Sequence, residues 1–125
     1  MEKKYLGFTS VAVSGQSINI GSKLGTVYIY DVNDLKETVE NNNLVTHITQ
    51  LKANKTGEYT LALSKWKNNA IRVIDSMTGK AIGEWPGVKT KVGLPMQAAF
   101  NEANYFGVGS SHGHISIYGF SNEMI

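Results

Sequence analysis

The fold is decided by the ten residues Gly21–Tyr30, GSKLGTVYIY, because the chain carries a second version of them 88 positions later. The second version is Gly109–Tyr118, GSSHGHISIY, which keeps both glycines, the first serine, one isoleucine and the final tyrosine. A divergent version, Leu63–Asp75, lies midway between them and has two extra residues in its turn. The chain is therefore built from repeats with a period of 44 residues, which is typical of β-propellers and solenoid arrays.

Each repeat consists of short alternating runs separated by turns that contain Gly or Asn, a pattern that indicates antiparallel strands joined by hairpins. β-Branched and aromatic residues dominate the runs, as they do in strands. The expected strands are Thr9–Val13, Ser17–Ser22, Val27–Asp31, Thr46–Leu51, Tyr59–Ser64, Ala70–Asp75, Lys80–Trp85, Met96–Phe100, Tyr105–Ser110 and His114–Tyr118. The stretch Asn33–Asn43 is the least regular, and it is compatible with one helical turn or with a ragged outer strand.

The repeat predicts an all-β protein of about three four-stranded antiparallel blades, which form an incomplete propeller ring on their own. The units are expected at approximately residues 5–43, 44–92 and 93–125 of a single 125-residue domain. Small residues in the second strand of each unit, Gly21, Ala62 and Gly109, would let neighbouring sheets approach closely. An ordinary antiparallel sandwich, which uses small residues for the same purpose, is the alternative.

Composition supports a strand-rich domain and excludes several kinds of site. Hydrophobic residues make up 42% of the chain and charged residues 18%, with 13 Gly and 2 Pro. The chain has no Cys, which excludes disulfides, cysteine zinc sites and thiol nucleophiles. No apolar run reaches the roughly 18 residues that a membrane-spanning helix needs, so we expect no membrane partner.

Positive charge is concentrated in the middle third of the chain. Residues 50–92 contain eight basic and three acidic residues, whereas residues 1–49 and 93–125 carry net charges of −1 and −2. A basic patch of this kind can follow the phosphates of a nucleic acid. The alternative is a set of solvent-facing lysines on outer strands.

A strand that ends in Gly-Ser, followed by a turn and the run GTVYIYD, resembles a repeat of the WD-repeat family of β-propellers. Two features of that family's pattern are changed here. The tryptophan of its third strand is replaced by Tyr30, Ile74 and Tyr118, and the aspartate of its turn by Leu24 and His112. The resemblance therefore implies divergent repeats that are held together by packing, without the family's Asp–His–Ser–Trp hydrogen-bond network.

Within that family, about residues 8–120 are most similar to the WD-repeat subunits of the small-subunit processome. The motifs that carry the likeness are Asn43–Leu51, Lys67–Val73, Gly83–Pro86, Ala99–Asn101, Tyr105–Ser110 and Ile115–Tyr118. The likeness implies a non-enzymatic scaffold in pre-rRNA processing and ribosome biogenesis, located in the nucleolus or nucleus among other protein subunits of a ribonucleoprotein assembly. A direct RNA-binding module that uses the basic middle blade, and an unrelated cytoplasmic WD-repeat adaptor, remain as alternatives.

Two segments are candidate contact surfaces for a protein partner or for RNA. One is the enlarged middle hairpin, which interleaves an aromatic residue with bases, and the other is the basic loop that follows the middle unit. The candidate residues are Lys65, Trp66, Lys67, Asn68, Lys89 and Lys91. An exposed tryptophan between lysines could anchor a protein or stack on a base. Alternatively, Trp66 folds back over the blade edge and the loop is an ordinary solvated connection.

We expect no catalytic residues, no metal site and no cofactor. His47 lies in an alternating run, and His112 and His114 share a turn with no carboxylate nearby in sequence. No serine stands on a recognisable nucleophile turn between a strand and a helix. Gly21 and Gly25 lead into a strand, whereas a phosphate-binding glycine loop leads into a helix.

Three blades fall short of the about four to eight blades found in closed propellers. Two apolar sheet faces and unpaired strand edges would be left in water, where they are templates for association. We therefore expect the chain to self-associate, most simply as a dimer of three-blade halves, or to be completed by further blades or a partner subunit. The short apolar run Tyr5–Phe8 could supply an outer strand to a third unit.

Overall fold

The computed structural model describes residues 7–82, 85–86, 91–101 and 105–119, with the backbone alone at 35–38. Within these ranges the chain forms ten β-strands and no helix, so none there is long and apolar enough to cross a membrane. The strands are β1 (Phe8–Ser14), β2 (Ser17–Ser22), β3 (Val27–Asp31), β4 (Asp34–Asn41), β5 (Gln50–Ala53), β6 (Tyr59–Leu63), β7 (Ile71–Asp75), β8 (Pro95–Phe100), β9 (Tyr105–Ser110) and β10 (Ile115–Gly119).

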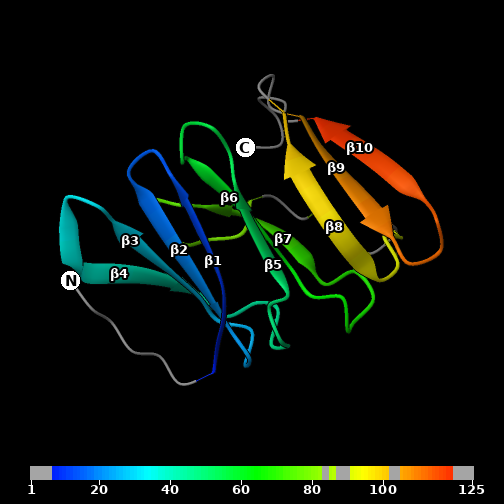
Figure 1. Ribbon diagram of the computed structural model, residues 1–125, viewed down its shortest axis with the longest axis horizontal. Coiled ribbons are helices and arrows are strands. Elements are labelled where there is room, and N and C mark those ends of the chain that lie inside the picture. The colour runs from blue at the N-terminus through cyan, green and yellow to red at the C-terminus, as the bar shows by residue number, and fades with distance from the viewer. Residues whose placement is uncertain (1–6, 83–84, 87–90, 102–104, 120–125) are drawn as a thin grey trace.

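The ten strands form three antiparallel sheets that follow one another along the chain, from blue through green to red in Figure 1. The sheets have the orders β1-β2-β3-β4, β5-β6-β7 and β10-β9-β8, so each is a meander of consecutive hairpins. The first strands of the sheets are neighbours, because β1 contacts β5 and β5 contacts β8. The sheets fan out from this shared inner line without closing a ring, which confirms the expected all-β class of antiparallel blades.

The sequence repeat is visible in the strand registers. Gly21 pairs with Val27 in the first sheet, and Gly109 pairs with Ile115 in the third, at the same offset of 88 residues. The middle sheet keeps this register, with Leu63 in the place of the glycine. Positions that correspond in sequence therefore point to the same side of their sheets, because successive side chains alternate along a strand.

The strand expected at Thr46–Leu51 is displaced along the chain, since β5 comprises Gln50–Ala53. The residues before β5 turn towards the first sheet, where the Ile48 backbone N–H donates to the Ser22 carbonyl at 3.0 Å. The Ile48 side chain is fully buried there. Burying the Ile48 side chain between the sheets therefore stabilises the structure more than extending β5 back to Thr46 would.

Two segments at the outer edges of the sheets differ from each other. The irregular stretch Asn33–Asn43 contains β4, a full outer strand paired with β3, and the helical turn does not form. The fourth strand expected at Lys80–Trp85 is reduced, within the described residues, to an isolated bridge between Ile74 and Ala81 with a backbone hydrogen bond on either side. Residues 83 and 84 lie outside the described part of the chain.

The run Tyr5–Phe8 was expected to supply an outer strand to a third unit, and the structure describes only its last two residues. Phe8 begins β1 and pairs with Ser22. Residues 5 and 6 lie outside the described ranges. The described end of this run therefore belongs to the first sheet.

The first and second sheets pack through a core that combines apolar and polar side chains. Its buried apolar members are Val27, Ile29, Leu44, Ile48, Leu51, Ala62, Ala70 and Ile74. Thr60 Oγ1 donates to Asn19 Oδ1 at 3.0 Å, and both residues are fully buried. Asn19 Nδ2 in turn donates to Ser17 Oγ at 3.1 Å. A polar pair shielded from water therefore ties the two sheets together.

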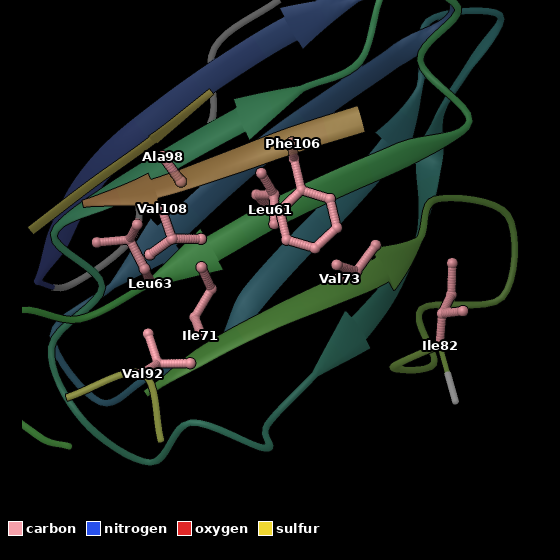
Figure 2. Close-up of a cluster of buried hydrophobic side chains, with 9 residues drawn as sticks. All are labelled: Leu61, Leu63, Ile71, Val73, Ile82, Val92, Ala98, Phe106 and Val108. Atoms are coloured by element: carbon pink, nitrogen blue, oxygen red, sulfur yellow. The ribbon is translucent and has the colours of Figure 1, made fainter. Parts of the chain in front are cut away.

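The second and third sheets pack through an apolar core, shown in Figure 2. Its members are Leu61, Leu63, Ile71, Val73, Ile82, Val92, Ala98, Phe106 and Val108. The ring of Phe106 lies 5.4 Å from the ring of Tyr118 in a stacked arrangement and 5.2 Å from Trp85 edge-on. Aromatic rings at these separations attract each other in addition to the area they bury. A hydrogen bond also joins these two sheets, because the Ala98 N–H of β8 donates to Gln50 Oε1 of β5 at 2.9 Å.

Replacing Thr60 with Val should lower the free energy of unfolding by about 1–3 kcal/mol, because the buried Asn19 oxygen loses its donor while the packed volume hardly changes. Urea denaturation followed by tryptophan fluorescence measures this loss. Thr56→Val is the matched control, since Thr56 is exposed and water replaces its hydroxyl; its cost should stay within about 0.5 kcal/mol. Equal losses in the two variants would show that the bond between the sheets contributes nothing.

Candidate interaction surface

Five connections between strands meet at one end of the sheets, along the lower side of Figure 1, and we call their surface the basic end. They are residues 22–26, 42–49, 64–70 and 110–114, together with 91–94, which are the last part of the connection between β7 and β8. Four hydrogen bonds link each connection to the next: Ile48 N–H to Ser22 O at 3.0 Å, Lys65 N–H to Thr49 Oγ1 at 3.1 Å, Asn69 N–H to Gly93 O at 2.8 Å and Ser111 N–H to Leu94 O at 3.0 Å. The basic end is therefore one continuous surface.

The five segments that form the basic end contain no acidic residue. Its exposed lysines are Lys23, Lys65, Lys67 and Lys91. The turns at the other end of the same strands contain Asp31, Asp34, Glu58 and Asp75, together with Lys55 and Lys80. The chain is therefore electrically asymmetric along its strands, and the basic end is the one that attracts an anionic partner.

The hairpin between β6 and β7, residues 64–70, carries Lys65, Trp66, Lys67 and Asn68, all of them exposed. The Trp66 side chain is 65% exposed, so it does not fold back over the blade edge. Lys65 Nζ lies 5.2 Å from the centre of the Trp66 ring, within the range of a cation–π contact. The hairpin thus presents a flat apolar ring with positive charge on both sides of it in the sequence.

Asn69 shapes this hairpin and joins it to the connection that contains Lys91. Its backbone φ is 58°, in the left-handed region that asparagine adopts more readily than most residues. Asn69 Oδ1 accepts a hydrogen bond from the Val92 N–H at 2.7 Å, and the Asn69 N–H donates to the Gly93 carbonyl at 2.8 Å. Lys91 precedes this double contact, so the described end of the second predicted segment, residues 91–93, lies beside the middle hairpin.

Arg72 supports the hairpin from the sheet. Its Nη1 donates to the carbonyl of Asn69 at 3.0 Å and to that of Ile71 at 2.8 Å. Burial lowers the pKa of the Arg72 guanidinium from its ordinary value. The group nevertheless keeps its charge at neutral pH, because arginine does not deprotonate in proteins. Arg72 is therefore a structural part of the basic end.

The remaining predicted positions are placed as follows. Lys89 lies outside the described residues. His47 is half-buried in a connection, outside the strand in which it was expected, and His112 Nδ1 lies 3.1 Å from Ser111 Oγ in an exposed turn. In the part of the chain that the structure describes, no three His, Asp or Glu side chains are grouped to hold a metal ion.

A groove of about 840 Å³ between the first and second sheets, at the end opposite the basic end, was not predicted from the sequence. The ionisable residues that line it are Asp31, Asp34, Glu58, Asp75, Tyr30 and Tyr59. Burial, then the charge of Glu40, raises the pKa of Tyr30; burial, then Glu58 and Asp75, raises the pKa of Tyr59. The sequence carries one signal of this groove: an aspartate, Asp31 or Asp75, ends the third strand of each of the first two repeats.

Comparison with known proteins identifies the fold. No protein-family model matches the chain, and no curated protein matches its sequence. The β-propeller domain of Myceliophteria thermophila Cps50 (Swd1) matches with a TM-score of 0.66 at 18% identity, over 92% of this chain and 36% of that one. The WD40 repeats of RRP9 match with a TM-score of 0.56 at 11% identity, over 97% of this chain and 41% of that one. The chain therefore spans less than half the length of the propellers it resembles.

Replacing Asn69 with Ala should lower the free energy of unfolding by about 1–3 kcal/mol, because the Val92 N–H loses its acceptor and alanine is strained at positive φ. Asn69→Asp keeps a side-chain oxygen and should cost less. Amide hydrogen exchange at Val92 separates the two variants, with protection lost in the first and retained in the second. Unchanged Val92 protection in Asn69→Ala would contradict the role given to this side chain.

Proposed function

Because the chain has the fold of three consecutive WD-type propeller blades in an unclosed ring, we propose that it is a non-enzymatic scaffold in a ribonucleoprotein assembly, the small-subunit processome. A scaffold of this kind holds partner subunits in place and carries out no reaction on them. Its contribution to pre-rRNA processing and ribosome biogenesis would lie in the geometry of the contacts it makes. Its place of action is the nucleolus or nucleus.

The sequence supports this assignment through its resemblance to the last three blades of U3 small nucleolar RNA-associated protein 18. The resemblance covers about residues 8–120 and depends on the two-residue expansion of the middle hairpin and on the motifs Gly83–Pro86 and Ile115–Tyr118. The expansion is the most specific of these features, because it interrupts the 44-residue period.

The observation that carries the proposal is the exposed Trp66 on a braced hairpin. Tryptophan is the residue type most enriched among the side chains that dominate binding energy at protein interfaces. A side chain of this size that is 65% exposed has left much of its apolar area in water, which a partner would cover. The hairpin is held by Asn69 and Arg72, so little conformational freedom is lost when a partner binds.

Direct RNA binding is the second candidate, and the charge of the basic end favours it. Lys65, Lys67 and Lys91 are exposed on the basic end, and no acidic residue occurs in the five segments that form it. A positive surface that follows phosphates, combined with an aromatic ring on which a base stacks, is the common arrangement in proteins that bind single-stranded nucleic acid.

The combined replacement of Lys65, Trp66 and Lys67 with Ala should weaken association with pre-ribosomal particles at least tenfold, because it removes the ring and two charges. The measurement is recovery of pre-rRNA with the tagged chain from nucleolar extract. Stability should change by less than about 1 kcal/mol, since all three side chains are exposed. The matched control removes two lysines and one exposed apolar residue from the other end of the same sheet: Lys55→Ala, Met77→Ala and Lys80→Ala. Equal recovery with both variants would contradict the proposal.

A salt titration distinguishes RNA contact from protein contact. If RNA binds the basic end, the logarithm of affinity for a single-stranded oligonucleotide should fall with the logarithm of salt concentration, by about 0.7 per phosphate contacted. The triple alanine variant, which lacks two lysines, should then show a slope shallower by about 1.4. A slope near zero for the unmodified chain would exclude direct RNA binding and leave the protein scaffold.

A further inference from the structure

The hairpins that follow β2 and β6 on the basic end close in the same way. The Ser22 N–H donates to the Thr26 carbonyl at 3.1 Å, and the Ser64 N–H donates to the Ala70 carbonyl at 2.9 Å. Thr26 and Ala70 are one period of 44 residues apart. Residues counted forward from the two serines therefore leave their sheets at equivalent points.

Each of these serines is followed by a lysine and then by a large apolar side chain. Lys23 and Leu24 follow in the first hairpin, and Lys65 and Trp66 follow in the second. The Leu24 side chain is 83% exposed and the Trp66 side chain is 65% exposed. The two repeats therefore present the same pair of chemical groups to solvent, a positive charge beside an apolar side chain.

The connection between β4 and β5 lies between the two hairpins (Figure 1), and it carries a third exposed apolar side chain, Val45. The backbone φ of Val45 is 47°, in the left-handed region, where a β-branched residue is an outlier. The preceding Leu44 is buried, and a side chain on Gly25 would lie 2.5 Å from the Val45 backbone nitrogen. Strained residues persist only where their surroundings hold them, and they gather at functional sites.

The three exposed apolar side chains belong to one surface. Gly25, which follows Leu24, lies against the backbone of Val45. On the other side, Thr49 Oγ1 accepts a hydrogen bond from the Lys65 N–H at 3.1 Å. Val45 and Thr49 are four residues apart, a span of at most about 14 Å. We call the three side chains the apolar patch: Leu24, Val45 and Trp66.

The composition of the apolar patch favours a protein partner over RNA. A base stacks on an aromatic ring, and Trp66 alone supplies one. Leu24 and Val45 are aliphatic, and burying them against apolar side chains of a partner would remove their area from water. Lys23 and Lys65 stand beside the patch, and the segments of the basic end contain no acidic residue. The complementary partner therefore carries carboxylates as well as apolar side chains.

We propose that the apolar patch, together with Lys23 and Lys65, binds an acidic protein segment whose apolar side chains cover the patch. This inference rests on the scaffold function proposed above and names the chemistry of its partner. Packed sheets lie about 10 Å apart, and an extended chain advances about 3.3 Å per residue. Apolar side chains about three residues apart in the segment therefore reach neighbouring hairpins, and acidic residues between them reach the lysines.

The first test measures which chemistry the surface prefers. Three fluorescein-labelled probes are titrated with the purified chain: an acidic peptide with leucine at about every third position, the same peptide with serine in place of leucine, and oligouridylate of equal length. The leucine peptide should bind roughly tenfold more tightly than the serine peptide, because its side chains cover apolar area. Equal binding of the two peptides, tighter binding of oligouridylate, or no binding of the leucine peptide would each overturn the proposal.

The second test locates the contact. Leu24→Ser should weaken binding of the leucine peptide roughly fivefold and leave binding of the serine peptide unchanged, because it removes apolar area alone. Met77→Ser is the matched control, since Met77 is 85% exposed on a turn at the other end of the sheets, and it should change neither affinity. If both variants lost the same affinity, the peptide would be adhering to any exposed apolar side chain, and the proposal would fail.

The third test, Val45→Asn, separates binding from stability. Asparagine adopts positive φ more readily than a β-branched residue, so the temperature of half-unfolding should rise. Affinity for the leucine peptide should fall roughly threefold, because an apolar contact is lost. A residue with a structural role alone would not lower affinity while its replacement raises stability. A variant that unfolds at a lower temperature, or one that binds the leucine peptide undiminished, would contradict the proposal.

Failure of this inference and failure of the proposed function give different results. If the scaffold function holds and the partner is not an acidic segment, the triple alanine variant still loses association with pre-ribosomal particles, whereas Leu24→Ser retains it. If the scaffold function is wrong, the purified chain still prefers the leucine peptide, and neither variant changes the recovery of pre-rRNA.

Discussion

Close approach of neighbouring sheets is the constraint on which the rest of the structure depends. Gly15 and Gly57 lie back to back in the inner turns of the first two sheets, and a side chain on Gly15 would collide with the Thr56 carbonyl oxygen. A side chain on Gly21 would in the same way collide with Ile48. Only residues without a Cβ allow backbones to meet at such distances. Gly15, Gly21 and Gly57 are therefore required by the spacing of the first two sheets.

The same close approach builds the basic end. The chain leaves the first sheet, buries Ile48 against it and only then enters β5, so the connection is held beside the 22–26 hairpin. The connection after the second sheet is held in the same way through Asn69 and Val92. Packing between blades thus gathers lysines from the first two repeats on one surface. Any interaction made there is linked to the integrity of the sheets beneath it.

Most strand bounds could be predicted from the sequence, because the register of a hairpin depends on nearby residues. The repeat also gives three versions of the same hairpin from which to predict it. The strands around Gly21 and Gly109 lie within one residue of their expected bounds. The start of β5 and the union of Lys91 with the middle hairpin could not be read, because each depends on a contact between residues distant in sequence, such as Asn69 with Val92. The acidic groove was not predicted for the same reason, since its carboxylates come from turns that are distant in sequence.

The separation of charge between the two ends gives the molecule an electric dipole parallel to its strands. Lysines lie at one pole and the carboxylates that surround the groove lie at the other. Near a polyanion, the field exerts a torque on such a dipole before any contact forms, so the molecule arrives with the Trp66 hairpin leading. Its opposite pole then points away from the anion and repels further anionic chains. The dipole thereby favours one orientation of the molecule against a polyanion.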